Sequence, residues 1–312
     1  MAEIFWPGPV IFHAHWFGGL SKSVNSPEDY RRRIDDTFCL INEFRQRTNA
    51  SLAWTAHNLL PHNSIFPDVD VELRRKIIEE FDVVHFMDER HERLLYELTG
   101  ERPRASFCVS HPHYSMAQPD FVTKNDARNQ LGLDPSSEIV LFFGSIQRYK
   151  GLDQLVDAFR QARSKKVGVN LRLVIAGYPS DPDYVNEIHS QIAGDPLIRF
   201  FPNKVADEDL QLFFRSSNAV VLPYNGNQLN SGAAMLALTF GIVVIAPNEP
   251  AFTALTKYGL VTYDKEAPHS LVSALCKVPS FRQGANDEFL EKFDPDRISG
   301  SFFDELLKSV SD

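Results

Sequence analysis

Residues 139–151 read IVLFFGSIQRYKG and combine an apolar run, a glycine and two cations, Arg148 and Lys150, that flank Tyr149. The helical segment LDQLVDAFRQA follows at once. A strand, a tight turn and a helix are the repeating unit of a parallel α/β sheet, in which ligands bind beyond the carboxyl ends of the strands. The stretch therefore predicts an α/β fold. Its cations lie where a phosphate can bind or, alternatively, where a strand simply reaches solvent.

Strand-like runs separated by helical segments recur along the chain. A helix is expected from Ser26-Pro27, a cap followed by proline at the first helical position, to about Thr48. Nearly continuous β-branched strands are typical of parallel sheets covered by helices on both faces. We therefore expect two Rossmann-like, doubly wound domains that face a cleft. The expected strands lie at 9–15, 51–57, 82–86 and 104–110, then at 139–144, 171–177, 197–201, 219–224 and 242–247.

A polar, proline-bearing stretch at 111–138 separates the two blocks of strands. It predicts an N-terminal domain at 1–120, a C-terminal domain at 121–290 and a final helix at 291–312 that packs back towards the N-terminal domain. The first block holds only four expected strands and lacks an opening strand–helix unit. We therefore expect a shortened N-terminal domain.

The composition is that of a soluble globular protein, with 43% hydrophobic residues, 23% charged residues and a net charge of −9. This acidic balance argues against nucleic acid as a partner, because phosphate backbones require a basic surface. No apolar run is long enough to span a membrane and the first residues do not resemble a signal peptide, so a cytoplasmic location is expected. The basic clusters at 31–33 and 74–76 are interpreted as solvated helix faces; the alternative is a peripheral contact with the cytoplasmic membrane face.

A second stretch, LPYNGNQLNSGAAMLALTFG at 222–241, follows another expected strand. The strand ends at Tyr224, and Asn230-Ser231-Gly232 opens an apolar helix. Asn230 or Ser231 can cap the helix, while Gly232 allows a ligand to approach the helix N-terminus. The turn predicts either a plain cap or a second anion-binding position in the same sheet.

Eight of the ten histidines lie in the first 113 residues, at 13, 15, 57, 62, 85, 91, 111 and 113. His13 and His15 alternate along a strand and share one face. Such a pair can bind a metal, but no third ligand stands at a convincing spacing. His57, at the end of an expected strand, is better placed to act as a base or a phosphate donor.

Three motifs of other enzyme classes are absent from the sequence: G-x-G-x-x-G, the P-loop and G-x-S-x-G. Their absence argues against a dinucleotide oxidoreductase, a nucleotide triphosphatase and a serine hydrolase of the α/β type.

Seven fragments, taken in order, give the sequence a family resemblance: VIFHAHW, WTAHNLLPHN, SHPHY, FFGSIQRYKGLDQLV, LRLVIAGYP, VVLPYNGNQLNSGAAMLALTFG and VVIAP. The chain resembles GT-B glycosyltransferases of bacterial exopolysaccharide assembly, in particular the group of the xanthan-type GDP-mannose β-mannosyltransferase and related GT4-like enzymes. The resemblance spans most of the chain and implies a GT-B fold.

The resemblance implies transfer of a sugar from a nucleotide-sugar donor, GDP-mannose or a UDP-sugar, to a lipid-linked or oligosaccharide acceptor in exopolysaccharide or cell-surface glycan synthesis. It implies no cofactor and no metal. His57 or His15 is the implied base that deprotonates the acceptor hydroxyl. The implied donor-binding residues are Gly144, Arg148, Lys150, Tyr224, Asn230, Ser231 and Gly232.

The sequence departs from the family pattern at several positions. Gln228 and Leu236 stand where many retaining GT-B enzymes carry two glutamates. Ser145 stands where many carry an arginine after the glycine, and Phe17 follows Trp16 where closer relatives often carry an acid. The absent glutamates and the shortened N-terminal domain favour an alternative, a catalytically degenerate relative that serves as a nucleotide-sugar-binding or partner subunit. A third hypothesis is a metal-dependent hydrolase built around His13 and His15.

Overall fold

The computed structural model describes residues 8–17, 19–61, 64–165, 169–226, 228–267, 269–281, 284 and 286–311. The chain divides into two compact units. The N-terminal unit comprises Met1–His111 and Asp296–Asp312, and the C-terminal unit comprises Pro112–Pro295. The last helix therefore belongs to the same unit as the first strand.

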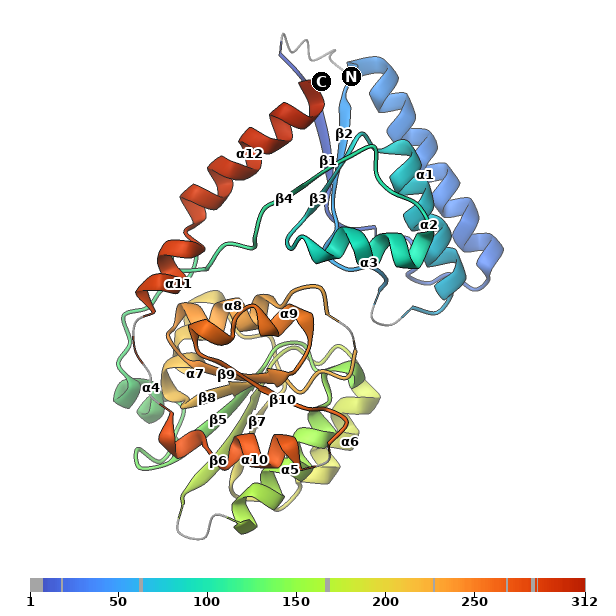
Figure 1. Ribbon diagram of the computed structural model, residues 1–312. Coiled ribbons are helices and arrows are strands. Elements are labelled where there is room, and N and C mark those ends of the chain that lie inside the picture. The colour runs from blue at the N-terminus through green and yellow to red at the C-terminus, as the bar shows by residue number, and fades with distance from the viewer. Residues whose placement is uncertain are drawn as a thin grey trace. The chain divides into compact units, whose positions relative to one another are not determined.

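The N-terminal unit is built on a parallel sheet of four strands in the order β1-β2-β3-β4. One face packs against α1, α2 and α3, and the other packs against α12 (Figure 1). The register sets Thr55 directly beside His85 on the neighbouring strand. The strands are β1 (Ile11–Ala14), β2 (Ser51–Thr55), β3 (Val83–Phe86) and β4 (Ala105–Cys108), and the helices are α1 (Pro27–Thr48), α2 (Pro67–Glu80), α3 (Arg90–Thr99) and α12 (Pro295–Ser311).

Helix α1 begins as its sequence predicts. The Ser26 hydroxyl accepts a hydrogen bond from the Asp29 amide and Pro27 occupies the first helical position. The two basic clusters form ion pairs and hydrogen bonds within the unit: Arg31 pairs with Glu72 at 2.7 Å and Lys76 with Asp35 at 2.7 Å. These contacts join α1 to α2.

The C-terminal unit contains a parallel six-stranded sheet in the order β10-β9-β8-β5-β6-β7. Alternate residues of β5 enter different apolar cores, Ile139 and Leu141 on one face and Val140 and Phe142 on the other. The strand is thus buried on both sides, as its nearly continuous apolar run predicts. The strands are β5 (Glu138–Phe143), β6 (Leu171–Ala176), β7 (Ile198–Phe201), β8 (Ala219–Val221), β9 (Val243–Pro247) and β10 (Leu260–Tyr263).

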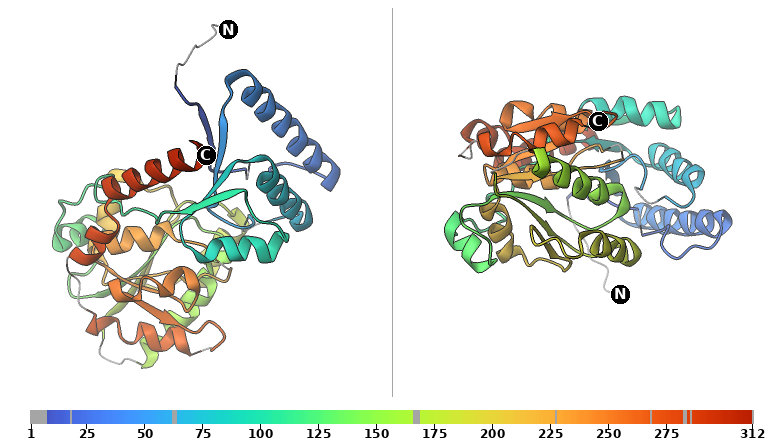
Figure 2. Two further views of the ribbon diagram at one scale, coloured as in Figure 1. Left: turned by 45° about the horizontal axis from the view of Figure 1, so that its top comes forward. Right: turned by 90° about the horizontal axis from the view of Figure 1, so that it is seen from below.

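Helices cover both faces of this sheet (Figures 1 and 2). The core on one face includes residues of α5, α6 and α10, and the core on the other includes residues of α7, α8, α9 and α11. The helices are α4 (Lys124–Gln130), α5 (Leu152–Lys165), α6 (Pro182–Ile192), α7 (Leu210–Ser216), α8 (Gly232–Thr239), α9 (Pro250–Thr253), α10 (Ser270–Leu275) and α11 (Asp287–Lys292), with 3₁₀ turns η1 (Arg148–Lys150), η2 (Asp207–Asp209), η3 (Thr256–Tyr258) and η4 (Val278–Ser280).

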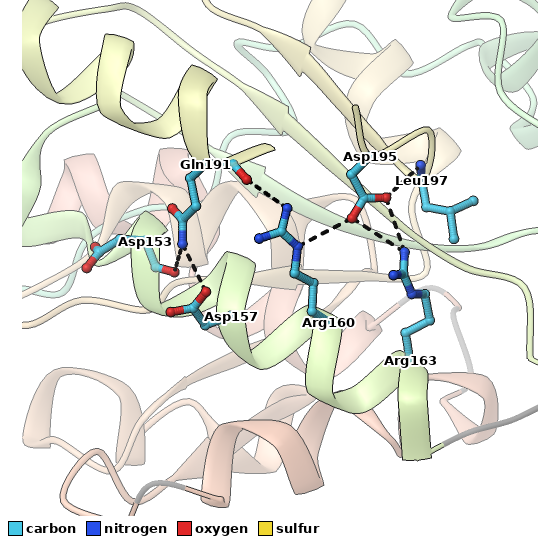
Figure 3. A network of polar contacts seen from close by, with 7 residues as sticks. All are labelled: Asp153, Asp157, Arg160, Arg163, Gln191, Asp195 and Leu197. Atoms are coloured by element: carbon cyan, nitrogen blue, oxygen red, sulfur yellow. Dashed lines mark hydrogen bonds and ion pairs between the residues drawn. The ribbon is translucent and has the colours of Figure 1, made fainter. Parts of the chain in front are cut away.

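Polar contacts hold α5 against α6 and the loop that follows it (Figure 3). Asp195 accepts from both Arg160 and Arg163, at 3.4 and 3.1 Å. Arg160 also donates to the Gln191 carbonyl at 2.7 Å, and the Gln191 amide donates to Asp157 at 3.0 Å. The contacts fix the helix that follows the basic turn.

Two parallel α/β sheets confirm the expected fold class, while some elements differ from the sequence-based expectation. Strand β10 was not predicted, because LVTY is a short run at the edge of the sheet that follows only the four-residue α9 and the 3₁₀ turn η3. The expected strand at 219–224 pairs only over Ala219–Val221, since Pro223 lacks an N–H for the ladder. Within the described part of the chain, no helix is both long and apolar enough to span a membrane.

Candidate donor and acceptor sites

The basic turn after β5 is fixed against the residues that follow β8. Gly151 has a φ of +65°, and a Cβ there would lie 2.0 Å from the Pro223 carbonyl oxygen. The Asn225 amide donates to the Tyr149 carbonyl at 2.8 Å. Only glycine fits at position 151, so the turn is held close to the carboxyl end of β8.

The Lys150 side chain lies at the carboxyl edge of the sheet. Its Nζ donates to the Tyr224 hydroxyl at 2.8 Å and lies 4.2 Å from the centre of the Tyr224 ring and 5.5 Å from that of Tyr149. A Cβ on Gly144 would be 3.5 Å from the same Nζ. Among the described residues, no carboxylate forms an ion pair with this ammonium group.

The surroundings of Lys150 keep its side chain charged. Burial by itself lowers the pKa of Lys150, but the hydroxyls of Tyr224 and Tyr149 offset this effect and the net shift of the pKa is upward. A partly buried ammonium without a counter-ion is energetically unfavourable unless an anion joins it. Lys150 therefore offers a preformed position for an anionic ligand.

Arg148 is oriented differently. Its exposed guanidinium forms two hydrogen bonds with Glu187 of α6, at 2.8 and 2.5 Å, and lies 5.1 Å from the centre of the Tyr184 ring. The hydrogen bonds to Glu187 raise the pKa of Arg148 and lower that of Glu187. The sequence predicts both cations on one phosphate, whereas the structure brings only Lys150 together with Gly144 and Tyr224.

Helix α8 begins at the second predicted anion position. Ser231 is its cap and accepts from the Ala234 amide at 3.2 Å. The amides of Gly232 and Ala233 donate to no acceptor among the described residues. A Cβ on Gly232 would lie 3.0 Å from the Tyr114 hydroxyl. The start of the helix thus combines two open amides with a tyrosine hydroxyl, while the Asn230 side chain is not its cap.

The two positions of the absent glutamates are both buried. Leu236 lies in the apolar core beneath α8. Gln228 precedes the helix, and its amide makes a long contact of 3.5 Å with the Gly226 carbonyl. Ser145 accepts from Gln147 at 3.2 Å, beside the basic turn. No carboxylate stands at any of these three positions.

Histidines gather at the carboxyl edge of the N-terminal sheet. His13 on β1 contacts the Thr55 hydroxyl through Nε2 at 2.8 Å. Thr55 contacts Nδ1 of His85 at 3.1 Å, and Nε2 of His85 contacts the Val109 carbonyl at 2.9 Å. This chain of hydrogen bonds crosses three neighbouring strands on the face covered by α12, where Phe302 stacks on His13 with ring centres 5.3 Å apart.

The two histidines predicted as catalytic lie in contact with each other. Nδ1 of His15 is 3.0 Å from Nε2 of His57, so one of the two nitrogens donates to the other. His57 also stacks against Trp16, with ring centres 4.3 Å apart and an angle of 11°. The ring centres of His13 and His15 are 4.2 Å apart, which confirms that they share one side of the strand.

Three members of the cluster, His13, His57 and His85, are uncharged near neutral pH. Burial, followed by repulsion from neighbouring histidines, lowers the pKa of His13 and of His57 to about 4 each. Burial also lowers the pKa of His85 to about 4. Neutral imidazoles suit hydroxyl groups, because each has one N–H donor and one nitrogen acceptor.

The other histidines lie apart from this hydrogen-bond chain. His91 is buried in α3, and His113 belongs to the C-terminal unit, where its ring lies near Phe289. His111 and His113 fall in different units, and His62 lies outside the described residues. No three histidine, cysteine or acidic side chains of the described residues are arranged to hold a metal ion.

Comparison with known protein families gives a match in the second half of the chain. Residues 137–279 match the protein family described as "Glycosyl transferases group 1". The match lies within the C-terminal unit. The matched residues include the basic turn, Lys150, Tyr224 and the start of α8.

Two curated proteins are similar to the chain. The GDP-mannose:glycolipid 4-beta-D-mannosyltransferase of Xanthomonas campestris pv. campestris is 26% identical over 247 residues, 78% of this chain and 60% of the relative. The D-inositol 3-phosphate glycosyltransferase of Rhodococcus erythropolis is 28% identical over 194 residues, 57% of this chain and 43% of the relative. The matches thus span about half of each relative.

Solved structures support the GT-B fold. Sucrose-phosphate synthase from Thermosynechococcus elongatus superposes with a TM-score of 0.71 at 18% identity, covering 87% of this chain and 71% of that protein. Anabaena HepE in complex with UDP superposes with a TM-score of 0.69 at 15% identity, covering 91% and 77%. The expected GT-B fold is therefore confirmed.

Sequence reasoning missed three side chains of these sites. Tyr114 lies in the stretch taken as a linker, so its position beside Gly232 had no sequence signal beyond the fragment SHPHY. Thr55 and His85 lie inside strands, where polar residues are usually interpreted as part of the core. Only the register of β2 and β3 brings them together with His13.

Proposed function

We propose that the protein is a glycosyltransferase that moves a sugar from a nucleotide-sugar donor to an acceptor hydroxyl. One observation carries the proposal: the Lys150 ammonium lies without a carboxylate partner at the carboxyl edge of a sheet whose residues match the glycosyl transferases group 1 family. The donor is GDP-mannose or a UDP-sugar. The names of the Xanthomonas relative and of the HepE complex support these two nucleotides.

Breaking the bond between a sugar and a diphosphate leaves negative charge on the departing phosphate oxygen. In the proposed reaction Lys150 and the open amides of Gly232 and Ala233 stabilise this charge. The Tyr224 hydroxyl holds the ammonium in place before the donor binds, and the lack of a side chain at Gly144 and Gly151 leaves room for the turn. Loss of one such preorganised group typically lowers the rate by about 10²–10³-fold.

The acceptor hydroxyl must lose a proton when its oxygen attacks the anomeric carbon. His57 and His15 are the proposed candidates for the base, since their rings contact each other at the carboxyl edge of the N-terminal sheet, 3.0 Å apart, and burial lowers the pKa of His57 so that it is neutral near pH 7. The proposed acceptor is a lipid-linked sugar or an oligosaccharide. The words "glycolipid" and "mannosyltransferase" in the relative's name support a role in exopolysaccharide or cell-surface glycan synthesis, with a peripheral position at the cytoplasmic membrane face.

No cofactor and no metal ion take part in the proposed reaction. Lys150 and the helix N-terminus supply the positive charge that a divalent cation supplies in other phosphate sites. Transfer should therefore continue in the presence of a chelator. A loss of transfer that returns on addition of magnesium or manganese would contradict this point.

Calorimetric titration of the full chain with GDP and with UDP tests the proposal. We expect one of them to bind to the wild type, and to bind about 10–100-fold more weakly to Lys150→Gln, because a charge-assisted hydrogen bond is lost. Lys277→Gln is the matched control, since this exposed lysine follows α10 and so lies away from the basic turn. No binding of either nucleotide at millimolar concentration would overturn the proposal.

A second function is favoured by Gln228 and Leu236, which leave two buried positions without the glutamates of many retaining enzymes. In this case the protein binds a nucleotide sugar without transferring it and acts as a binding or partner subunit. Nucleotide binding together with undetectable transfer and undetectable hydrolysis of the sugar nucleotide would favour this second function.

A further inference from the structure

Hydrogen bonds link Val109, His85, Thr55 and His13 in series. The Val109 carbonyl at one end of this series fixes the direction of all of them. The Val109 carbonyl can only accept, so Nε2 of His85 carries a proton. In a neutral imidazole Nδ1 is then the acceptor, and the Thr55 hydroxyl must donate to it. Thr55 has its proton committed to His85, so its oxygen accepts from Nε2 of His13. His13 is left with an unprotonated Nδ1.

The opposite direction requires an unfavourable state of His85. The other neutral tautomer would set the lone pair of Nε2 against the lone pairs of the Val109 carbonyl, 2.9 Å away. A protonated His85 could donate from both nitrogens, but a pKa of about 4 leaves about one molecule in a thousand protonated at pH 7. His85 is only 7% exposed and packs between Phe107 and Phe302, with ring centres 5.0 and 4.9 Å away.

Nδ1 of His13 is not fully buried. Among the described residues it has no hydrogen-bond partner, and it is not one of their buried polar atoms that lack a partner. Stacking on Phe302, at an angle of 25°, fixes the plane of the ring. No carboxylate contacts His13, Thr55 or His85 among these residues, so none of them draws a proton onto Nδ1.

We propose that Thr55 and His85 are positioning residues that hold His13 in its Nε2–H tautomer, and that the open Nδ1 of His13 accepts a hydrogen bond from a sugar hydroxyl. The nitrogen lone pair can only accept, so it selects a hydroxyl and disfavours a phosphate or carboxylate oxygen. The choice of a sugar as the ligand rests on the proposed function, while the tautomer of His13 does not.

Nuclear magnetic resonance of the full chain with ¹⁵N-labelled histidine measures the tautomer directly. The His13 signals are assigned by their loss in His13→Gln. We expect the Nε2–H form in the wild type and in Thr55→Ser, which keeps the hydroxyl, and a mixture of tautomers in Thr55→Val. An Nδ1–H form in the wild type, or a Thr55→Val spectrum equal to that of the wild type, would overturn the tautomer lock.

A second variant covers the case in which Thr55→Val fails to fold, because that change leaves Nδ1 of buried His85 without a donor. His85→Phe fills the same aromatic site beside Phe107 and removes the imidazole that links Val109 to Thr55. It too should give a mixture of His13 tautomers. A single Nε2–H form in folded His85→Phe would show that the chain does not set the tautomer.

Octyl β-D-glucoside, below its micelle concentration, is the probe for the sugar hydroxyl. We expect it to shift the His13 nitrogen signals, and to bind about tenfold more weakly to Thr55→Val than to the wild type or Thr55→Ser, the cost of one neutral hydrogen bond. Inorganic phosphate should leave these signals unchanged. Equal affinities for all three proteins, no shift with the glucoside, or a shift with phosphate would overturn the hydroxyl assignment. Nucleotide titration of the wild type and of Lys150→Gln tests the proposed function separately.

Discussion

The carboxyl edges of the two parallel sheets differ in charge although the same strand–turn–helix unit builds both. In the C-terminal unit Lys150 remains charged and has no carboxylate partner among the described residues, and α8 adds open amides. In the N-terminal unit the side chains that meet are histidines, whose burial lowers the pKa of His13, His57 and His85 to about 4 each. One edge therefore suits an anion and the other suits neutral hydroxyl groups.

The difference teaches that topology supplies the position of a site while a few side chains decide its ligand. Parallel strands direct the amide groups and helix N-termini of both sheets to their carboxyl edges. A single lysine held by two tyrosines makes one edge positive. At the other edge, the Val109 carbonyl accepts from His85 and so fixes which histidine nitrogens carry protons. Changes at these side chains should alter one edge and spare the other.

The largest effect is expected for Lys150→Gln. The C-terminal edge loses its charge while the amide keeps most of the volume, so nucleotide affinity should fall about 10–100-fold and transfer about 10²–10³-fold. Calorimetry and initial rates measure the two quantities. Lys277→Gln should match the wild type in both. An unchanged Lys150→Gln would remove the basis of the contrast between the two edges.

The second effect concerns acid stability of the N-terminal edge. The pKa of His85 is about 4 in the folded protein and 6.5 ordinarily, so the unfolded chain binds the proton first as the pH falls. The stability that depends on neutral His85 is present above pH 6.5 and is lost between pH 6.5 and 4. For His85 alone, the free energy of unfolding should fall by about 2 kcal/mol between pH 7 and 4.5.

Urea unfolding at both pH values measures this loss, and His85→Phe should remove the part due to His85. His189→Gln, at an exposed position on α6, is the control and should keep the wild-type pH dependence. Equal pH dependence in the wild type and His85→Phe would mean that His85 is not held neutral by its burial.

A smaller effect is expected for Tyr224→Phe, which sharpens the account of the charged edge. The change removes the acceptor that holds Nζ of Lys150 at 2.8 Å but keeps the ring face. Nucleotide affinity should fall about fivefold to tenfold, the value of one hydrogen bond. The same titration measures it, and a loss as large as that of Lys150→Gln would mean that Tyr224 contacts the ligand itself.

The smallest effect is expected for Arg148→Gln. The guanidinium is exposed and paired with Glu187, and an ion pair in solvent contributes little because water screens it. Nucleotide affinity should change by less than about threefold. A loss equal to that of Lys150→Gln would restore the sequence-based prediction in which both cations hold the diphosphate and Arg148 leaves Glu187 when the ligand binds.

Much of the fold could be predicted from the sequence, because local signals were strong. The run from Ile139 to Phe143 is apolar at every position and forms a strand buried on both faces, and Ser26-Pro27 starts α1 as expected. Strand order was not predictable, since β5 pairs with both β6 and β8, and β8 lies far along the chain. The short β10 carries too few residues to be distinguished from a loop.

The sites could be located from the sequence but not resolved in detail. Glycines and cations after a strand marked the basic turn. Arg148 and Lys150 nevertheless have different partners, because the Arg148 guanidinium pairs with Glu187 of α6. His13 and His15 were recognisable as neighbours by their alternation. Their protonation depends on Thr55 and His85, which come from two other strands, and the sequence contains no signal for that register.

Hydrogen exchange of the full chain, with and without saturating GDP or UDP, tests the contrast between the two edges most directly. Protection is expected in peptides that cover 144–151 and 224–234, the basic turn and the start of α8. Peptides that cover 11–15 and 55–57, the histidine edge, should exchange as in the free protein. Protection of the histidine edge by the nucleotide, with the basic turn unchanged, would contradict the account.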